Sequence, residues 1–153
     1  MKFCIDTSAL LDGWVRYYPP KIFSSLWDKM DVLIKNGTMI STEEVLHELE
    51  KKADEVHSWA KQRSEMFLPL DEPVQVEVGL ILATYPRLVD VRKNRSIADP
   101  FVIAQAKISG CMVVTGERAS HNLDKPRIPD VCAELGIECI DFLGMIKKNS
   151  WQF

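Results

Sequence analysis

The chain has 153 residues, of which 46% are hydrophobic and 27% charged, values ordinary for a globular protein with one core. The formal net charge of -3 argues against binding of nucleic acid by bulk positive charge, although it leaves room for local basic patches. No apolar run reaches the length of a membrane span, and Asp6 interrupts the N-terminal apolar stretch before a signal-peptide core can form. We therefore expect a single domain over residues 1–153, with no membrane segment.

The cysteines and histidines indicate the compartment and argue against a zinc site. The four cysteines stand at positions 4, 111, 132 and 139, and no two of them form a C-x-x-C pair. The three histidines offer no spacing typical of zinc ligands, so zinc is the weaker alternative. We interpret the cysteines as reduced core side chains of a cytoplasmic protein.

Strands and helices are predicted to alternate along the chain. Short apolar runs indicate buried strands, and apolar side chains three and four residues apart indicate helices between them. The expected elements, in chain order, are a strand over residues 2–5, a helix that Ser8 caps, a helix over 22–34, a strand over 38–41, a helix that Ser41 or Thr42 caps, a helix over 56–66, a helix over 74–88 as far as Tyr85-Pro86, a buried helix over 97–108, a strand over 111–115, a helix over 131–135, a strand over 137–140 and a helix from Asp141 through Ile146. This alternation predicts an α/β fold with a parallel sheet and helices on both faces.

Carboxylates follow the predicted strands at the edge where ligands bind in open parallel sheets. Asp6 ends the first strand, and Glu117 lies just past the strand over 111–115. Asp99 lies near the start of the helix that leads into that strand. Glu44 and Glu48 are four residues apart on one helix face, just after the second strand. Several carboxylates therefore converge on one rim, where they would repel one another without a cation.

This acidic cluster predicts a metal site. Hard oxygen ligands suit Mg²⁺ or Mn²⁺, and such an ion would activate water and stabilise charge that develops on a phosphodiester. Taken singly, each residue has a simpler structural interpretation. Asp6 and Asp99 are typical helix caps, Glu44 and Glu48 are typical of a solvated helix face, and Glu117 is typical of a turn. Their shared position at strand-to-helix junctions favours the metal site over these separate roles.

Four motifs in this order resemble the PIN-domain nucleases, in particular the VapC-type toxins of toxin–antitoxin systems and their PIN-like relatives. They are IDTSALL, ISTEEVLHEL, IADPFVIAQAK and VVTGE, and together they extend over most of the chain. The third, with the glycine and the VVT strand that follow, is the most specific. The resemblance implies a metal-dependent endoribonuclease with a three-layer α/β/α fold and a mostly parallel central sheet.

The resemblance also implies roles for individual residues. Asp6 matches the first metal ligand and Asp99 the third acid. Glu48 best matches the helical glutamate of the family, with Glu44 as its rival one turn earlier. Glu117 stands where the family usually has aspartate, and its longer side chain can still reach a metal. The implied catalytic set is thus Asp6, Glu48, Asp99 and Glu117.

Further features concern the support of the site and departures from the family pattern. Thr7, Ser8 and Thr115 match hydroxyl positions that orient the carboxylates. The segment over 54–95 and the loop after Glu117 are long for a VapC-type toxin, and either could cover the site or bind a partner. Of two further acids, we interpret both Asp130 and Asp141 as helix-start residues, with Asp130 the better alternative candidate for the site.

An RNA substrate needs positive charge around the acidic rim. Candidate walls of such a groove are Arg87, Arg92, Lys93 and Arg95 on one side and Lys51, Lys52, Lys61 and Arg63 on the other, although each alone is typical of a solvated helix end. Trp14, Tyr17 and Tyr18 could stack on bases, or pack in a dimer interface or against an antitoxin. By resemblance we expect an RNA substrate, a possible antitoxin partner and a homodimer.

Three alternative functions remain. The substitution at Glu117 would fit a catalytically silent PIN-like module that regulates or binds proteins. A phosphotransferase of the haloacid-dehalogenase type also starts with an aspartate after a strand, but Ser8 stands where its second aspartate belongs. A receiver domain would need a phosphoacceptor aspartate at a middle strand and a late lysine, and neither is evident. Metal binding without RNA cleavage would identify the silent module.

Overall fold

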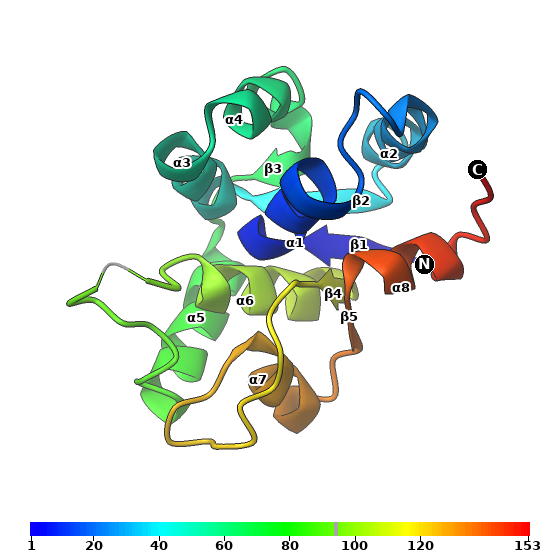
Figure 1. The fold of residues 1–153 in the computed structure, drawn as a ribbon. Coiled ribbons are helices and arrows are strands. Elements are labelled where there is room, and N and C mark those ends of the chain that lie inside the picture. The colour runs from blue at the N-terminus through cyan, green and yellow to red at the C-terminus, as the bar shows by residue number, and fades with distance from the viewer. Residues whose placement is uncertain (94) are drawn as a thin grey trace.

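Five parallel strands form the central sheet of the computed structural model, which describes residues 1–93 and 95–153 (Figure 1). The strands are β1 (Phe3–Ile5), β2 (Met39–Thr42), β3 (Phe67–Leu68), β4 (Met112–Val114) and β5 (Cys139–Ile140), in the order β3-β2-β1-β4-β5. The first strand lies in the middle, where Phe3 pairs with Met39 on one side and Met112 on the other. All three residues of β1 are buried, as expected for a strand covered on both faces.

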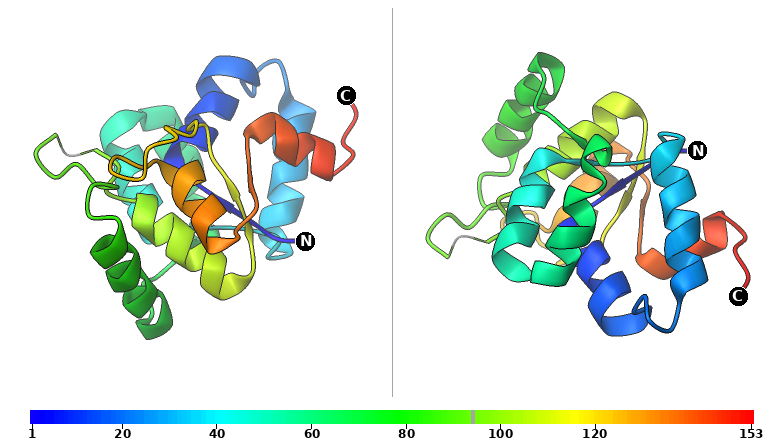
Figure 2. Two further views of the ribbon diagram at one scale, coloured as in Figure 1. Left: turned by 90° about the horizontal axis from the view of Figure 1, so that it is seen from below. Right: turned by 90° about the horizontal axis from the view of Figure 1, so that it is seen from above.

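Helices cover both faces of this sheet and complete three layers (Figure 2). They are α1 (Thr7–Leu11), the π-helix η1 (Asp12–Tyr17), α2 (Ser24–Lys35), α3 (Glu43–Lys52), α4 (Asp54–Lys61), the 3₁₀ turn η2 (Ser64–Met66), α5 (Glu72–Thr84), α6 (Asp99–Ser109), α7 (Ile128–Leu135) and α8 (Phe142–Lys148). Helices α1 to α4 lie on one face, and α5, α6 and α7 lie on the other (Figure 1). The predicted three-layer α/β/α fold with a parallel sheet is confirmed. No helix in the described part of the chain has the length and apolar character needed to cross a membrane.

The structure differs from the sequence-based expectation in its smallest elements. The helix expected over 56–66 ends at Lys61, and the chain then forms η2 and the unpredicted strand β3. This strand has two residues, paired with Ser41 and Thr42 of β2, so its hydrophobic pattern is too short to identify. The helix expected over 131–135 starts earlier, at Ile128, and the carboxylate of Asp130 in its first turn accepts a hydrogen bond of 2.8 Å from the backbone N–H of Arg127, the N-cap residue.

The cap of α1 differs from expectation, and that of α3 is one of the two expected residues. Asp6, and not Ser8, is the N-cap of α1, where its carboxylate accepts a hydrogen bond of 3.0 Å from the backbone N–H of Ala9. Thr42 occupies the N-cap of α3, whereas the hydroxyl of Ser41 donates to the carbonyl of Ile5 at 2.6 Å. This second contact holds the end of β1 against β2, immediately before Asp6.

Candidate metal centre

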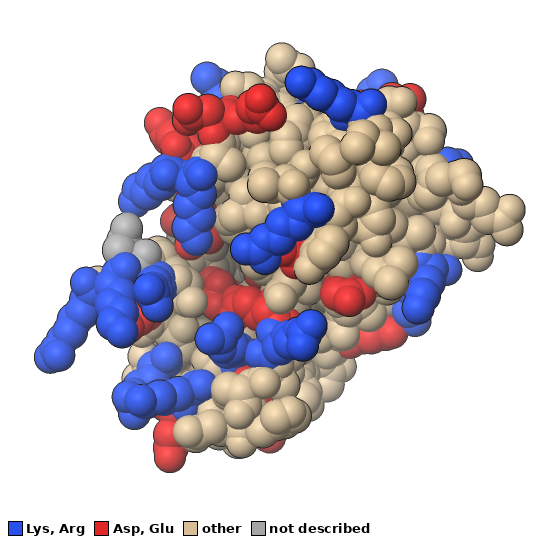
Figure 3. Space-filling model, viewed as in Figure 1, with Lys and Arg blue, Asp and Glu red and all other residues tan. Residues whose placement is uncertain are grey.

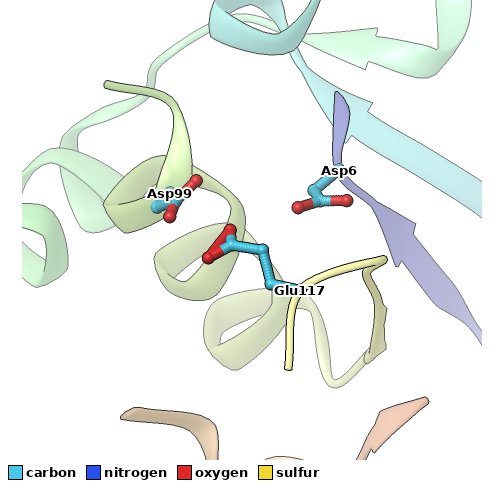
Figure 4. A group of neighbouring side chains, drawn as sticks. All are labelled: Asp6, Asp99 and Glu117. Carbon is cyan, nitrogen blue, oxygen red and sulfur yellow. The ribbon is translucent and has the colours of Figure 1, made fainter. Parts of the chain in front are cut away.

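Three carboxylates meet at the carboxyl edge of the sheet. Asp6 follows β1, Asp99 is the first residue of α6, and Glu117 follows β4 after two intervening residues. One oxygen from each lies within 4.8 Å of the other two. The side chains point toward one another from three separate elements (Figure 4). Asp6 and Asp99 are only 3% and 6% exposed, and Glu117 is half-buried, so the group lies at the floor of the site.

Hydroxyl and backbone donors fix the carboxylate of Asp6. Thr115 Oγ1 donates to its Oδ2 at 2.9 Å, and Ser8 Oγ donates to its Oδ1 at 2.9 Å. Burial, together with the neighbouring charge of Glu117, raises the pKa of Asp6 to about 7. The hydrogen bonds from Ala9, Ser8 and Thr115 oppose this rise because they favour the ionised form. The carboxylate is therefore held in one orientation, at a cost that a cation would relieve.

Asp99 has a buried oxygen that the rest of the described chain leaves without a partner. Ala98 is the N-cap of α6, so Asp99 stands at the first helical position and its carboxylate projects into the site rather than capping. Among the described residues, no donor forms a hydrogen bond to Asp99 Oδ2. Burial raises the pKa of Asp99 well above its usual value, and the charges of Glu117 and Asp6 add to this effect. Buried polar atoms are rarely left unpaired, and a bound cation would satisfy this one.

The structure separates the two candidate glutamates of α3. Glu48 lines the cavity that contains Asp6 and Asp99, and its Oε1 accepts a hydrogen bond of 2.6 Å from the hydroxyl of Thr7. Glu44 instead lies 3.8 Å from Nδ1 of His47 and lines a separate small hollow beside Leu68. Glu48 is therefore the glutamate of α3 that belongs to the acidic cavity.

A chain of hydroxyl contacts joins the end of β4 to α1. Ser8 Oγ accepts from the backbone N–H of Gly116 at 2.8 Å, and Thr115 Oγ1 accepts from the N–H of Glu117 at 3.0 Å. A Cβ atom at Gly116 would collide with Oδ2 of Asp12, so a larger residue there would displace the Asp12 side chain. The same three-residue turn thus positions both Glu117 and the donor to Asp6.

Basic side chains surround the acidic floor. The cavity has a volume of about 990 Å³ and is lined by five acidic and seven basic residues. In the space-filling view the acidic side chains lie in a hollow, with basic side chains around its rim (Figure 3). The basic lining consists of Lys52, Arg87, Arg92, Lys93, Arg95, Lys125 and Arg127. A polyanion could therefore approach carboxylates that would otherwise repel it.

The family described as a domain of unknown function (DUF4411) matches residues 3–153. The chain belongs to the DUF4411 family. No curated protein matches the sequence. The family match extends over the whole sheet and all three carboxylates of the acidic floor.

The solved structures similar to this DUF4411 protein include FitAcB and PAE2754. FitAcB from Neisseria gonorrhoeae has a TM-score of 0.52 and 14% sequence identity, over 92% of this chain and 98% of that chain. PAE2754 from Pyrobaculum aerophilum has a TM-score of 0.42 and 19% identity, over 89% of this chain and 96% of that chain. At such low identity the first similarity shows the fold alone, and the DUF4411 chain has a PIN-like α/β/α fold.

Sequence reasoning missed part of the basic rim of the DUF4411 protein. Lys125 and Arg127 come from the long loop after Glu117, whose path across the cavity has no local sequence signal. Arg63, expected in the rim, pairs with Asp31 at 2.9 Å through Nη2 and lies over the ring of Trp59 at 4.8 Å. Arg63 therefore joins the segment after α4 to α2, and its charge is neutralised by Asp31.

Two other acids of the DUF4411 protein have structural roles. Asp141 caps α8 by accepting from the N–H of Gly144 at 2.7 Å. Asp130 accepts from the backbone N–H groups of Ser120, His121 and Arg127 and closes the loop before α7. Burial opposes ionisation of Asp130, but these hydrogen bonds prevail and lower its pKa to about 2. Both residues are helix-start residues, as their sequence positions predicted.

Proposed function

We propose that this protein is a metal-dependent endoribonuclease that hydrolyses RNA phosphodiester bonds and acts as the toxin of a type II toxin–antitoxin pair. One observation carries the metal-dependent part: Asp99 Oδ2 is buried, has no partner among the described residues, and lies beside two further carboxylates. We also propose that residues 1–153 act as one domain in the cytoplasm, where the four free cysteines would stay reduced.

The donor set fits Mg²⁺ or Mn²⁺. Asp6, Asp99 and Glu117 would hold the ion, with Glu48 at the wall of the same cavity. A bound ion would supply a water of lowered pKa and would neutralise charge on the phosphate. The longer side chain of Glu117 reaches the other two carboxylates, which favours a working site over the silent module that its substitution suggested.

The protein's own side chains provide orientation and substrate binding. Thr115 and Ser8 hold the carboxylate of Asp6, and Thr7 holds that of Glu48, so the ligand oxygens are fixed before a substrate arrives. The basic rim binds phosphates on both sides of the acidic floor, with Arg87 and Arg92 from one loop and Arg127 from another. These contacts position a backbone phosphate over the floor and carry no sequence information of their own.

The toxin assignment and the partners rest on the sequence resemblance. We propose an antitoxin partner and a homodimer on that basis. Val76 and Leu80, one turn apart on α5, are 58% and 57% exposed, and such apolar side chains suit a protein interface. Sedimentation of the wild-type protein and of Leu80→Glu tests the dimer, because a charge in that interface should yield the monomer.

The experiment is cleavage of a mixed RNA pool by purified protein with Mg²⁺ or Mn²⁺, and with EDTA. Asp99→Asn should abolish metal-dependent cleavage, whereas Glu44→Gln, which changes a carboxylate on the same helix as Glu48 but outside the cavity, should retain it. If the wild type binds metal but does not cleave RNA, and Asp99→Asn loses metal binding, the protein is the silent module. Equal cleavage by wild type and Asp99→Asn would refute the proposed site.

The toxin assignment has a separate test in cells. Induced expression of the wild type should arrest growth, and Asp99→Asn should not. Normal growth with intact RNA, despite RNA cleavage by the purified protein, would contradict the toxin role and leave the nuclease role in place.

A further inference from the structure

A second cavity lies on the other side of Glu117. It has a volume of about 680 Å³ and lies between η1, the turn after β4 and the start of α8. Glu117 lines both this cavity and the acidic one, so the two cavities are neighbours that meet at this side chain. A strand that crosses the acidic floor beside Glu117 would continue into this space.

The two cavities differ in charge. The acidic cavity has a surplus of basic side chains in its lining, seven against five. The second cavity has two basic residues, Arg16 and Arg118, against three acidic ones, Asp12, Glu117 and Asp141. Arg16 and Asp12 are paired at 2.9 Å and compensate each other, which leaves Arg118 against Glu117 and Asp141. The second cavity is therefore unsuited to a phosphate and better suited to an uncharged polar group.

An aromatic wall makes the second cavity suitable for a flat ring. Tyr18 stacks on Phe142 with their centroids 5.4 Å apart and their planes at 29°, so this part of the wall is fixed. Tyr17 lies 6.3 Å from Tyr18 and is 61% exposed, which leaves its ring available to a ligand. Trp14, by contrast, packs edge-to-face on Trp27 at 4.9 Å and belongs to the packing of the helices.

We propose that this cavity binds the base of a nucleotide adjacent to the phosphate held over Asp6, Asp99 and Glu117. Tyr17 stacks on the base, because aromatic stacking accepts every base and needs no charge. The carboxylate of Asp141 lines the same space, and the oxygen that does not cap α8 accepts a hydrogen bond from a base N–H group or from a ribose hydroxyl. The inference rests on the proposed function, since it assigns one strand of RNA to both cavities.

The test measures binding, so that it does not depend on cleavage. The probe is a short single-stranded RNA of mixed sequence, compared with copies in which one nucleotide at a time is an abasic ribose. Removal of the base at one position should weaken binding to the wild type about tenfold, the usual scale of one stacked base. Tyr17→Ala should weaken binding to the intact RNA by the same factor. The affinity of this variant should not fall further when the base at that position is removed.

Two variants control for local damage. Tyr17→Phe keeps the ring and should behave as the wild type does. Val15→Ala changes an exposed residue of the same π-helix outside the cavity lining and should also leave the abasic effect intact. The inference would be overturned if wild type and Tyr17→Ala lost the same affinity as each other at every abasic position.

The outcomes also distinguish this inference from the proposed function. An abasic effect that depends on Tyr17, in a protein that does not cleave RNA, would sustain the base site and refute the nuclease. Cleavage of RNA without an abasic effect that depends on Tyr17 would sustain the nuclease and refute the base site. If the wild type binds none of these RNAs, both proposals fail.

Discussion

The hydroxyl of Thr7 donates a hydrogen bond of 2.6 Å to Oε1 of Glu48 and so joins α1 to α3 beside the acidic cavity. Thr7 follows Asp6 directly and is itself buried. A residue next to one carboxylate of the floor therefore orients a second carboxylate that comes from 41 residues further along the chain.

Loss of this contact should weaken metal binding while leaving the fold intact. Thr7→Val keeps the shape of the side chain but removes the donor, so the Glu48 carboxylate is free to rotate. We expect the affinity for Mn²⁺ to fall by about 10-fold or more, as measured by titration calorimetry. Thr7→Ser keeps a hydroxyl and serves as the control. An unchanged affinity in Thr7→Val would remove Glu48 from the metal centre.

The pKa of Asp6 predicts an unusual pH dependence for the metal-free protein. In the folded state it is raised to about 7, so between the ordinary value near 4 and pH 7 the folded chain holds a proton that the unfolded chain has lost. The contribution of Asp6 to stability is therefore present below about pH 4 and is lost as the pH rises to 7.

Denaturation with urea in EDTA, at a series of pH values, measures this effect. Asp6→Asn keeps a capping side chain and should lessen the loss of stability over this pH window. Addition of Mn²⁺ above pH 7 should stabilise the wild type and not Asp6→Asn. The same pH profile in both proteins would contradict the assignment of a buried, proton-binding Asp6.

Asp130 should have the opposite pH dependence. Its pKa is lowered to about 2 in the folded state, so its contribution to stability is present above about pH 4 and is lost as the pH falls to 2. Asp130→Ala leaves several backbone donors of the loop without an acceptor and should cost about 2 kcal/mol at neutral pH. Asp124→Ala, an exposed change in the same loop, is the matched control. A neutral effect of Asp130→Ala on urea denaturation would show that the loop finds other acceptors.

Two glycines should respond to alanine in opposite directions. A Cβ atom at Gly13 would collide with the ring of Phe142, so Gly13→Ala should destabilise the protein by about 1–3 kcal/mol. Gly79 is within α5 and has open space around its Cα, so Gly79→Ala should stabilise by roughly 0.5–1 kcal/mol. Thermal unfolding of both variants tests the pair, and a shift of the same sign in both would contradict the packing at Gly13.

The sequence was sufficient for four of the five strands and for the convergence of the three acids, because both follow general rules of parallel sheets. Asp6, Asp99 and Glu117 follow or precede buried apolar runs, and such positions converge at the carboxyl edge. The choice between Glu44 and Glu48 needed the structure, because both lie on one face of α3 and only its placement against Thr7 separates them.

Elements without a local pattern were beyond sequence reasoning. The two residues of β3 are too few for a periodic signal, and their pairing with β2 depends on how α3 and α4 return the chain to the sheet. Lys125 and Arg127 reach the cavity because Asp130 closes their loop, a contact that spacing alone does not specify. The second cavity likewise forms only where η1, the turn after β4 and α8 meet.

The central position of β1 has a consequence for the synthesis of the protein. Asp6 is synthesised well before its hydrogen-bond donor Thr115, which lies 109 residues later in the chain. The first strand also cannot form its pairing with β4 until β4 has been synthesised. Contacts between such distant residues form late in folding. A nascent chain that stops before Val114 therefore has Asp6 and Asp99 but no Glu117, and an unfinished copy cannot assemble the three-carboxylate centre.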